Sequence, residues 1–373
     1  MKKLFLVVLL LLFVSPVLLS QQPTAKLSPE VDERVELLSV VFRLAGNFEY
    51  NMSKLDRYTG DIDRQFGPFK THPAVVMAKK LADENGVGFD AVMFMAISLS
   101  KPPELQPLVP FSGTVPESRW GSKENALQFA SLLRQFYTDT HFEAFFQAHR
   151  ALYALAEQRF AATLTNIHVN WFSTFYGMPT PAKFRVIIGL NDGGANYGPR
   201  LVKPDGTQEF YAIMGSWTKD AEGDPTFDRS YLPTVIHEFN HSFINPLVES
   251  RFTEFKGLQT VYDAVGTTMK QNAYGNTKVM LQESLVRACV VLYLKENGST
   301  DVEVQNQIVE EEKKGFIWTP DLVALLQTYT SQRGQYRTLV DFMPQIETFF
   351  GALGARMPTL MEQAPKASGS QSL

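Results

Sequence analysis

The residues best suited to chemistry in this chain are two histidines and a glutamate in the run His237-Glu238-Phe239-Asn240-His241. Positions four apart on an α-helix lie on one face, so His237 and His241 can direct two imidazoles at one zinc ion. Glu238 would lie beside a water molecule on that ion. The spacing therefore predicts a zinc site able to hydrolyse peptide bonds, with Glu238 as the general base.

The residues around this motif predict a buried helix. Pro233 suits a first helical turn, and the Asn245-Pro246 pair is expected to stop the helix one turn beyond His241. Imidazoles inside an apolar helix need partners, and a metal would supply them. The alternative is a helix whose histidines only hydrogen-bond to their neighbours. The apolar positions are Leu232, Val235, Ile236, Phe239, Phe243 and Ile244.

A catalytic zinc ion usually takes a third protein ligand and keeps one position for water. The position six residues after His241 is Leu247, and no histidine follows His241, so the third ligand is a carboxylate or lies upstream. Glu283 is our prediction, because it opens an apolar helical run at 281–288. Its alternative role is a surface pair with Arg287. The other candidates are Glu249 and Asp263.

The start of the chain reads as an export signal. Lys2 and Lys3 precede an apolar run at 4–14, and Ser15-Pro16 breaks it before a predicted cleavage near Ser20. The mature protein is then periplasmic or secreted, without stable membrane insertion; an uncleaved anchor is the alternative. One cysteine, Cys289, cannot form an internal disulfide. A net charge of −4 and dispersed basic residues argue against nucleic acid as a partner.

The pattern of apolar residues predicts a mainly helical α+β fold. Helical spacing dominates residues 29–100 and 125–164, where His141 and His149 are expected to be packed or solvated rather than metal ligands. A proline-rich stretch at 101–122 is either a connector or the border of a cleft. We expect strands at 184–190 and 210–214, a glycine-rich turn at 191–198, and further helices at 258–269, 279–294, 322–329 and 339–350.

These elements divide the chain into four expected parts. Residues 1–20 form the signal, 21–170 a helical region, 171–362 a catalytic region packed with it as one unit, and 363–373 a disordered tail. The small sheet precedes the motif helix, and the site is expected in a cleft between the helical half and the sheet.

The motif with a glutamate on a later helix resembles the gluzincins, the thermolysin-like zinc metallopeptidases. The string His-Glu-Phe-Asn-His-Ser-Phe-Ile-Asn-Pro at 237–246 also resembles a bacterial domain-of-unknown-function family near that clan, together with Gly-Ala-Asn-Tyr-Gly at 194–198 and Glu-Ser-Leu-Val-Arg-Ala at 283–288. The resemblance covers roughly residues 171–294. It implies a zincin-like catalytic region.

The resemblance also implies roles for single residues. Zn²⁺ would be held by His237, His241 and Glu283, and the segment at Asn196 and Tyr197 would bind the substrate backbone. Donors for the oxyanion would be Tyr274, Arg287 or Tyr197.

One departure from the thermolysin-like pattern concerns the zinc-bound histidine. Those enzymes orient it with an aspartate four residues after the ligand glutamate, and Arg287 stands there in this chain. Another carboxylate, a backbone carbonyl or a different arrangement must replace the aspartate. Arg287 would hold Glu283 or bind a substrate carboxylate, and the latter would favour exopeptidase action.

The sequence therefore predicts an exported zinc metallopeptidase acting on a peptide or protein. Two alternatives remain at this point: a binding protein that keeps a zincin fold without turnover, and a zinc amidase acting on cell-wall peptides. The oligomeric state is open.

Overall fold

The computed structural model describes residues 27–113, 115–165, 167–178 and 182–363. The expected signal at 1–20 lies outside these residues, as does the expected tail apart from residue 363. Among the helices described, none combines the length and the apolar character that a bilayer crossing requires.

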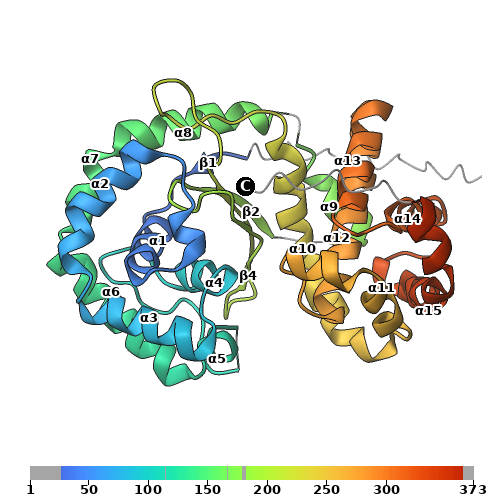
Figure 1. Ribbon diagram of the computed structural model, residues 1–373, viewed down its shortest axis with the longest axis horizontal. Coiled ribbons are helices and arrows are strands. Elements are labelled where there is room, and N and C mark those ends of the chain that lie inside the picture. The colour runs from blue at the N-terminus through green and yellow to red at the C-terminus, as the bar shows by residue number, and fades with distance from the viewer. Residues whose placement is uncertain (1–26, 114, 166, 179–181, 364–373) are drawn as a thin grey trace, which may run out of the picture.

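A small mixed sheet lies at the centre of a mainly helical molecule, so the predicted α+β class is confirmed (Figure 1). The strand order is β1-β2-β5-β3, with β4 also paired to β5. The first three strands in that order run parallel, and β3 and β4 run antiparallel to β5. The strands are β1 (Pro29–Glu30), β2 (Lys183–Gly189), β3 (Asn196–Tyr197), β4 (Arg200–Val202) and β5 (Gln208–Gly215).

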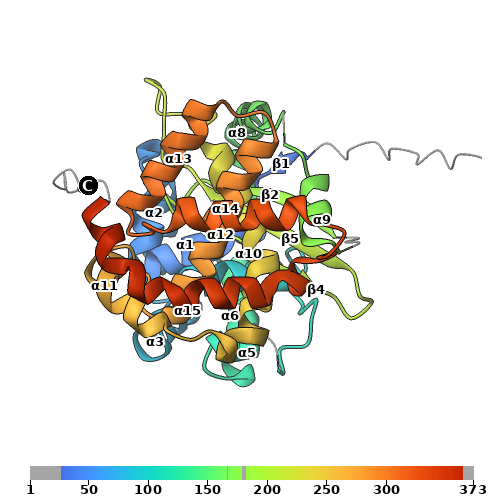
Figure 2. The ribbon, with the colours of Figure 1, turned by 90° about the vertical axis from the view of Figure 1, so that its right-hand side faces the viewer.

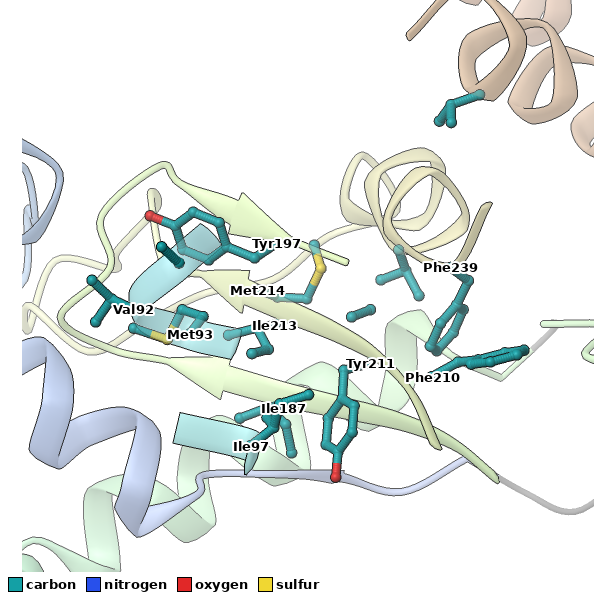
Figure 3. Close-up of a cluster of buried hydrophobic side chains, with 14 of the residues drawn as sticks. Val92, Met93, Ile97, Ile187, Tyr197, Phe210, Tyr211, Ile213, Met214 and Phe239 are labelled. Atoms are coloured by element: carbon teal, nitrogen blue, oxygen red, sulfur yellow. The ribbon is translucent and has the colours of Figure 1, made fainter. Parts of the chain in front are cut away.

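The two long strands confirm the predicted ones to within two residues at each end. Their β-branched and aromatic residues pair in register, with Val186 opposite Ala212 and Ile188 opposite Met214. Helix α4 packs on one face of this sheet. Figure 3 shows its residues Val92, Met93 and Ile97 in one cluster with side chains of β2, β3 and β5.

The helices before the sheet gather mainly on one side of it (Figure 1). Ser122 caps α6, because its hydroxyl accepts a hydrogen bond from the Asn125 backbone at 3.1 Å. These helices are α1 (Glu33–Ala45), α2 (Asp56–Phe66), α3 (Pro73–Asn85), α4 (Asp90–Ser98), α5 (Val115–Arg119), α6 (Lys123–Asp139), α7 (Phe142–Ala148) and α8 (Arg150–Thr163), with short 3₁₀ turns η1 (Phe48–Asn51) and η2 (Gly67–Phe69).

The later helices place α10 between the sheet and α12. Figure 2 shows α14 and α15 running across the outside of this pair. Differences from the expected helices include two additional helices, the short α9 and the charged α13, and a longer α15. The elements are α9 (Asn170–Tyr176), α10 (Tyr231–Arg251), η3 (Phe252–Glu254), α11 (Leu258–Gln271), α12 (Thr277–Glu296), α13 (Asp301–Lys313), α14 (Thr319–Ser331) and α15 (Leu339–Gln363).

The expected end of the motif helix at Pro246 is wrong, because α10 continues to Arg251. Proline has no N–H and so removes the hydrogen bond to the carbonyl of Ser242, four residues earlier. Arg200 of β4 approaches that carbonyl with its Nη1 at 3.5 Å. An interaction from outside the helix thus partly replaces the missing one, and the proline stays inside the helix.

Candidate metal centre

Helices α10 and α12 bring two imidazoles and one carboxylate together. The Nε2 atoms of His237 and His241 lie 3.0 Å apart. Glu283 lies across from them, with Oε2 3.5 Å from His237 Nε2 and Oε1 3.4 Å from His241 Nε2. Within the described residues these three side chains form a group that could hold a metal ion.

The spacing of the three side chains fits a tetrahedral ion. Bonds of about 2.0–2.1 Å from Zn²⁺ to nitrogen or oxygen place neighbouring ligand atoms about 3.3 Å apart in a tetrahedron. The two Nε2 atoms, 3.0 Å apart, are close to that value, and each has a different oxygen of Glu283 at 3.4 or 3.5 Å, so the carboxylate faces the imidazole pair. Two nitrogens and one carboxylate are also a donor set found in catalytic zinc sites, in which the fourth position takes water.

The imidazole of His237 is held in the neutral form that a metal requires. Burial is the main cause that lowers the pKa of His237 well below its ordinary range, and the positive charge of Arg287 adds to it. His241 Nδ1 lies 3.1 Å from the side-chain oxygen of Asn245. Because an amide oxygen only accepts, Nδ1 carries the proton and Nε2 presents its lone pair toward His237 and Glu283.

A buried network fixes the carboxylate of Glu283. Arg287 donates from Nη2 to Glu283 Oε2 at 2.9 Å and from Nη1 to Glu311 Oε2 at 2.5 Å. The same guanidinium donates to the hydroxyl of Tyr274 and lies over the ring of Phe316. Glu283 is only 9% exposed, so its pair with Arg287 is not the surface pair considered as an alternative.

Glu238 lies on α10 one residue after His237, and its side chain is buried. Burial is the main reason that its pKa stands well above the ordinary range for glutamate, and the negative charge of Glu283 adds to the rise. A carboxyl group with a raised pKa can both accept and return a proton near neutral pH.

Strand β3 is packed directly on the backbone of Glu238. A side chain at Gly198, the residue after β3, would collide with the Glu238 carbonyl, so glycine is required there. The end of the glycine-rich segment at 191–198 is therefore a place where strand and helix backbones approach closely. Strand β3 pairs with β5 along one edge through Asn196 and Tyr197, and no described strand pairs with its other edge.

The side chain of Asn196 makes hydrogen bonds to nearby backbone groups, and the side chain of Tyr197 is buried. The Asn196 amide donates to the Gly194 carbonyl and accepts from the Gly215 backbone, each at 3.1 Å. Tyr197 is buried, and its hydroxyl lies in the protein interior. The part of this segment left unpaired by the described strands is therefore its backbone edge, while the Tyr197 hydroxyl, the third expected oxyanion donor, is buried.

The other candidate ligands lie apart from this group. Glu249 pairs with Lys278 at 3.4 Å, and its side chain is exposed. Asp263 accepts from the side chain of Gln259 at 2.6 Å. His149 contacts the carboxylate of Asp61 at 3.2 Å, and His141 begins the short helix α7; neither belongs to the group.

Two residues of the centre were missed from the sequence. Asn245 follows His241 by four positions, so helical periodicity alone would have placed it beside His241 had the helix not been expected to end there. Glu311 lies on α13, a helix that was not predicted. No local signal connects Glu311 with Arg287, twenty-four positions earlier.

A comparison with protein families shows the family to which the chain belongs. A family model described as "Domain of unknown function (DUF4932)" matches residues 63–348. The chain belongs to the DUF4932 family. The matched range contains His237, Glu238, His241 and Glu283, so the DUF4932 domain carries the complete centre. No curated protein and no solved structure matches the chain.

Proposed function

We propose that this DUF4932 chain is an exported, zinc-dependent metallopeptidase with a gluzincin-like ligand set. The observation that carries the proposal is the convergence of His237, His241 and Glu283, with the buried Glu238 next to them on α10. A metal-binding group alone would suit many proteins. The adjacent carboxyl group of raised pKa adds the proton acceptor that hydrolysis needs.

The residues of the chain divide the chemical work between them. His237, His241 and Glu283 would hold the ion, and the chemistry that zinc supplies when bound is Lewis acidity, which lowers the pKa of water to about 7. Glu238 accepts the proton of that water as it attacks the peptide carbonyl. The same carboxyl then protonates the departing amine.

Tyr274 is the proposed donor to the oxyanion. Burial raises its pKa to about 12, so the hydroxyl keeps its proton at neutral pH. Its oxygen accepts from Arg287, which leaves the O–H free to donate. Arg287 is buried and its two terminal nitrogens are bonded to Glu283, Glu311 and Tyr274, so we assign it a positioning role.

The substrate is proposed to be a peptide or protein that binds in an extended conformation. Gly198, the residue after β3, lies against the Glu238 backbone and so keeps the strand close to α10. The outer edge of β3 has backbone groups that could pair with a peptide strand. Such a strand would bring its carbonyl groups past Glu238.

The test uses the full chain and Glu238→Gln, both dialysed against zinc, with bound metal and hydrolysis of casein and a fluorogenic peptide library measured. We expect bound zinc in both proteins and hydrolysis at least about a hundredfold slower in the variant. Equal hydrolysis would contradict the role of Glu238. Bound zinc without cleavage of any substrate would contradict the peptidase and favour a binding protein.

A further inference from the structure

Phe89 is an exposed aromatic residue in a strained backbone conformation. The residue is 55% exposed, and its backbone has φ 51° and ψ −127°, a combination that residues other than glycine rarely adopt. Strain of this kind costs on the order of 1–3 kcal/mol and persists only where neighbouring groups enforce it. The residue stands immediately before α4, where an ordinary turn would avoid the strain.

Two buried side chains hold the backbone of Phe89 in place. Glu49 accepts from the Phe89 N–H at 2.8 Å, and the Tyr50 hydroxyl donates to the Phe89 carbonyl at 3.0 Å. A side chain at Gly88 would collide with the carboxylate of Glu49, so this contact also depends on glycine. Both polar groups of one strained residue are thus fixed from 3₁₀ turn η1, while its ring is left in solvent.

The strained residue lies close to the edge strand and to Glu238. Figure 3 shows Val92 and Met93, in the first turn of α4, in the same cluster as Tyr197 of β3. Strand β3 in turn leads to Gly198, which lies against the Glu238 backbone. The beginning of α4 therefore borders the region where β3 meets α10.

A second connection fixes the same region from the other end of η1. The Ser53 hydroxyl donates to the Leu190 carbonyl at 3.0 Å, and a side chain at Gly193 would collide with the backbone of Met52. The segment that holds Phe89 is thus anchored to the turn leading into β3. These contacts fix the backbone that carries Phe89 relative to the turn before β3.

We propose that Phe89 is a specificity residue, and that the substrate is an extended peptide with a large apolar side chain next to the bond that is cleaved. This assignment rests on the proposed function and specifies which peptides the peptidase would cleave. A peptide lying along β3 would bring alternate side chains toward the start of α4. Contact with an apolar side chain of the peptide would bury apolar surface on both the peptide and the Phe89 ring. A polar side chain would gain less binding free energy from the same contact.

The experiment compares peptides that are identical except for Phe, Leu, Ala or Lys at one position. Zinc-loaded wild type and Phe89→Ala are assayed for cleavage, and binding is measured by fluorescence anisotropy on Glu238→Gln with and without Phe89→Ala. We expect wild type to prefer Phe and Leu over Ala and Lys, and Phe89→Ala to reduce this preference about tenfold. Phe89→Leu should restore most of it.

The matched control is Phe48→Ala, because Phe48 is another exposed phenylalanine, 73% exposed, on the same turn η1 but without the strained backbone. It should keep the wild-type preference. If wild type cleaves but Phe89→Ala keeps the preference, or Phe48→Ala loses it equally, the inference is overturned and the peptidase stands. If no peptide is cleaved, the proposed function fails, and the binding series alone decides whether Phe89 selects apolar side chains.

Discussion

Asn245 orients His241 in a way that the sequence comparison with thermolysin-like enzymes did not suggest. Those enzymes use an aspartate four residues after the ligand glutamate, and this chain has Arg287 there. The structure supplies an amide oxygen from α10 itself, 3.1 Å from His241 Nδ1. The ligand types were readable from spacing, whereas this partner depended on a helix that continues through Pro246.

Replacing Asn245 by alanine should weaken zinc binding about 10- to 100-fold, because His241 would lose the acceptor that fixes its tautomer. Competition with a chromophoric chelator measures the affinity. Asn245→Asp, which keeps an acceptor oxygen, should stay close to wild type. Unchanged affinity in Asn245→Ala would show that His241 is oriented by another group.

Arg287 neutralises two buried carboxylates, those of Glu283 and Glu311. Arg287→Ala should therefore lower the free energy of unfolding of the metal-free protein by about 3–5 kcal/mol, as urea denaturation would show. The control on the same helix is Lys278→Ala, whose partner Glu249 is exposed, and the expected loss is below about 1 kcal/mol. Similar losses for both variants would contradict the role of the buried network.

Among the elements, the long apolar strands and helices were predicted, whereas the two-residue strands and the charged helix α13 were not. Strands β2 and β5 follow from their β-branched and aromatic runs, and α10 follows from its apolar periodicity. Strands β1 and β3 have two residues each, too few to show an alternating pattern. Their position depends on pairing with distant strands, which no local property of the chain encodes.

The contact between β3 and α10 depends on the absence of a side chain at Gly198. Gly198→Ala should lower the free energy of unfolding by about 1–3 kcal/mol, because the strand must move away from the Glu238 backbone. Hydrolysis should fall further than zinc binding. Gly194→Ala is the matched control in the same turn, since a side chain there meets only an ordinary contact with Trp217. Equal stability of the two variants would refute the close packing.

At the scale of the whole molecule, the expected boundary near residue 170 does not separate two cores. Strand β1, near the start of the described residues, pairs with β2, and the cluster of buried apolar residues extends from Val31 to Met357. The composition, with 45% hydrophobic residues, is enough for a well-filled interior. The way in which the helical half shares the sheet could not be read from it, because β1 carries no periodic signal.

Glu36 of α1 contacts α2 and the residue after β2 within this shared core. It should make the free energy of unfolding depend on pH. It accepts from the Tyr58 hydroxyl at 2.6 Å and from the Leu190 backbone at 2.8 Å, and burial raises its pKa from 4.5 to about 7. The folded protein holds the proton more tightly, so its contribution is complete below pH 4.5 and is lost as the pH rises through 7.

The shift corresponds to about 3 kcal/mol of unfolding free energy lost between acidic and mildly alkaline pH. Glu36→Gln stays neutral and should show a flatter dependence of stability on pH, measured by urea denaturation at a series of pH values. An equally steep dependence in the variant would show that Glu36 does not carry this proton.

If His237, His241 and Glu283 hold one zinc ion as proposed, the purified chain must retain zinc in proportion to protein. Wild type, Glu283→Ala and Glu249→Ala are dialysed against zinc and then against buffer, and zinc per chain is measured by atomic absorption. We predict one zinc ion in wild type and in Glu249→Ala, and little in Glu283→Ala. A wild type without zinc, or a Glu283→Ala variant that keeps it, would contradict the account.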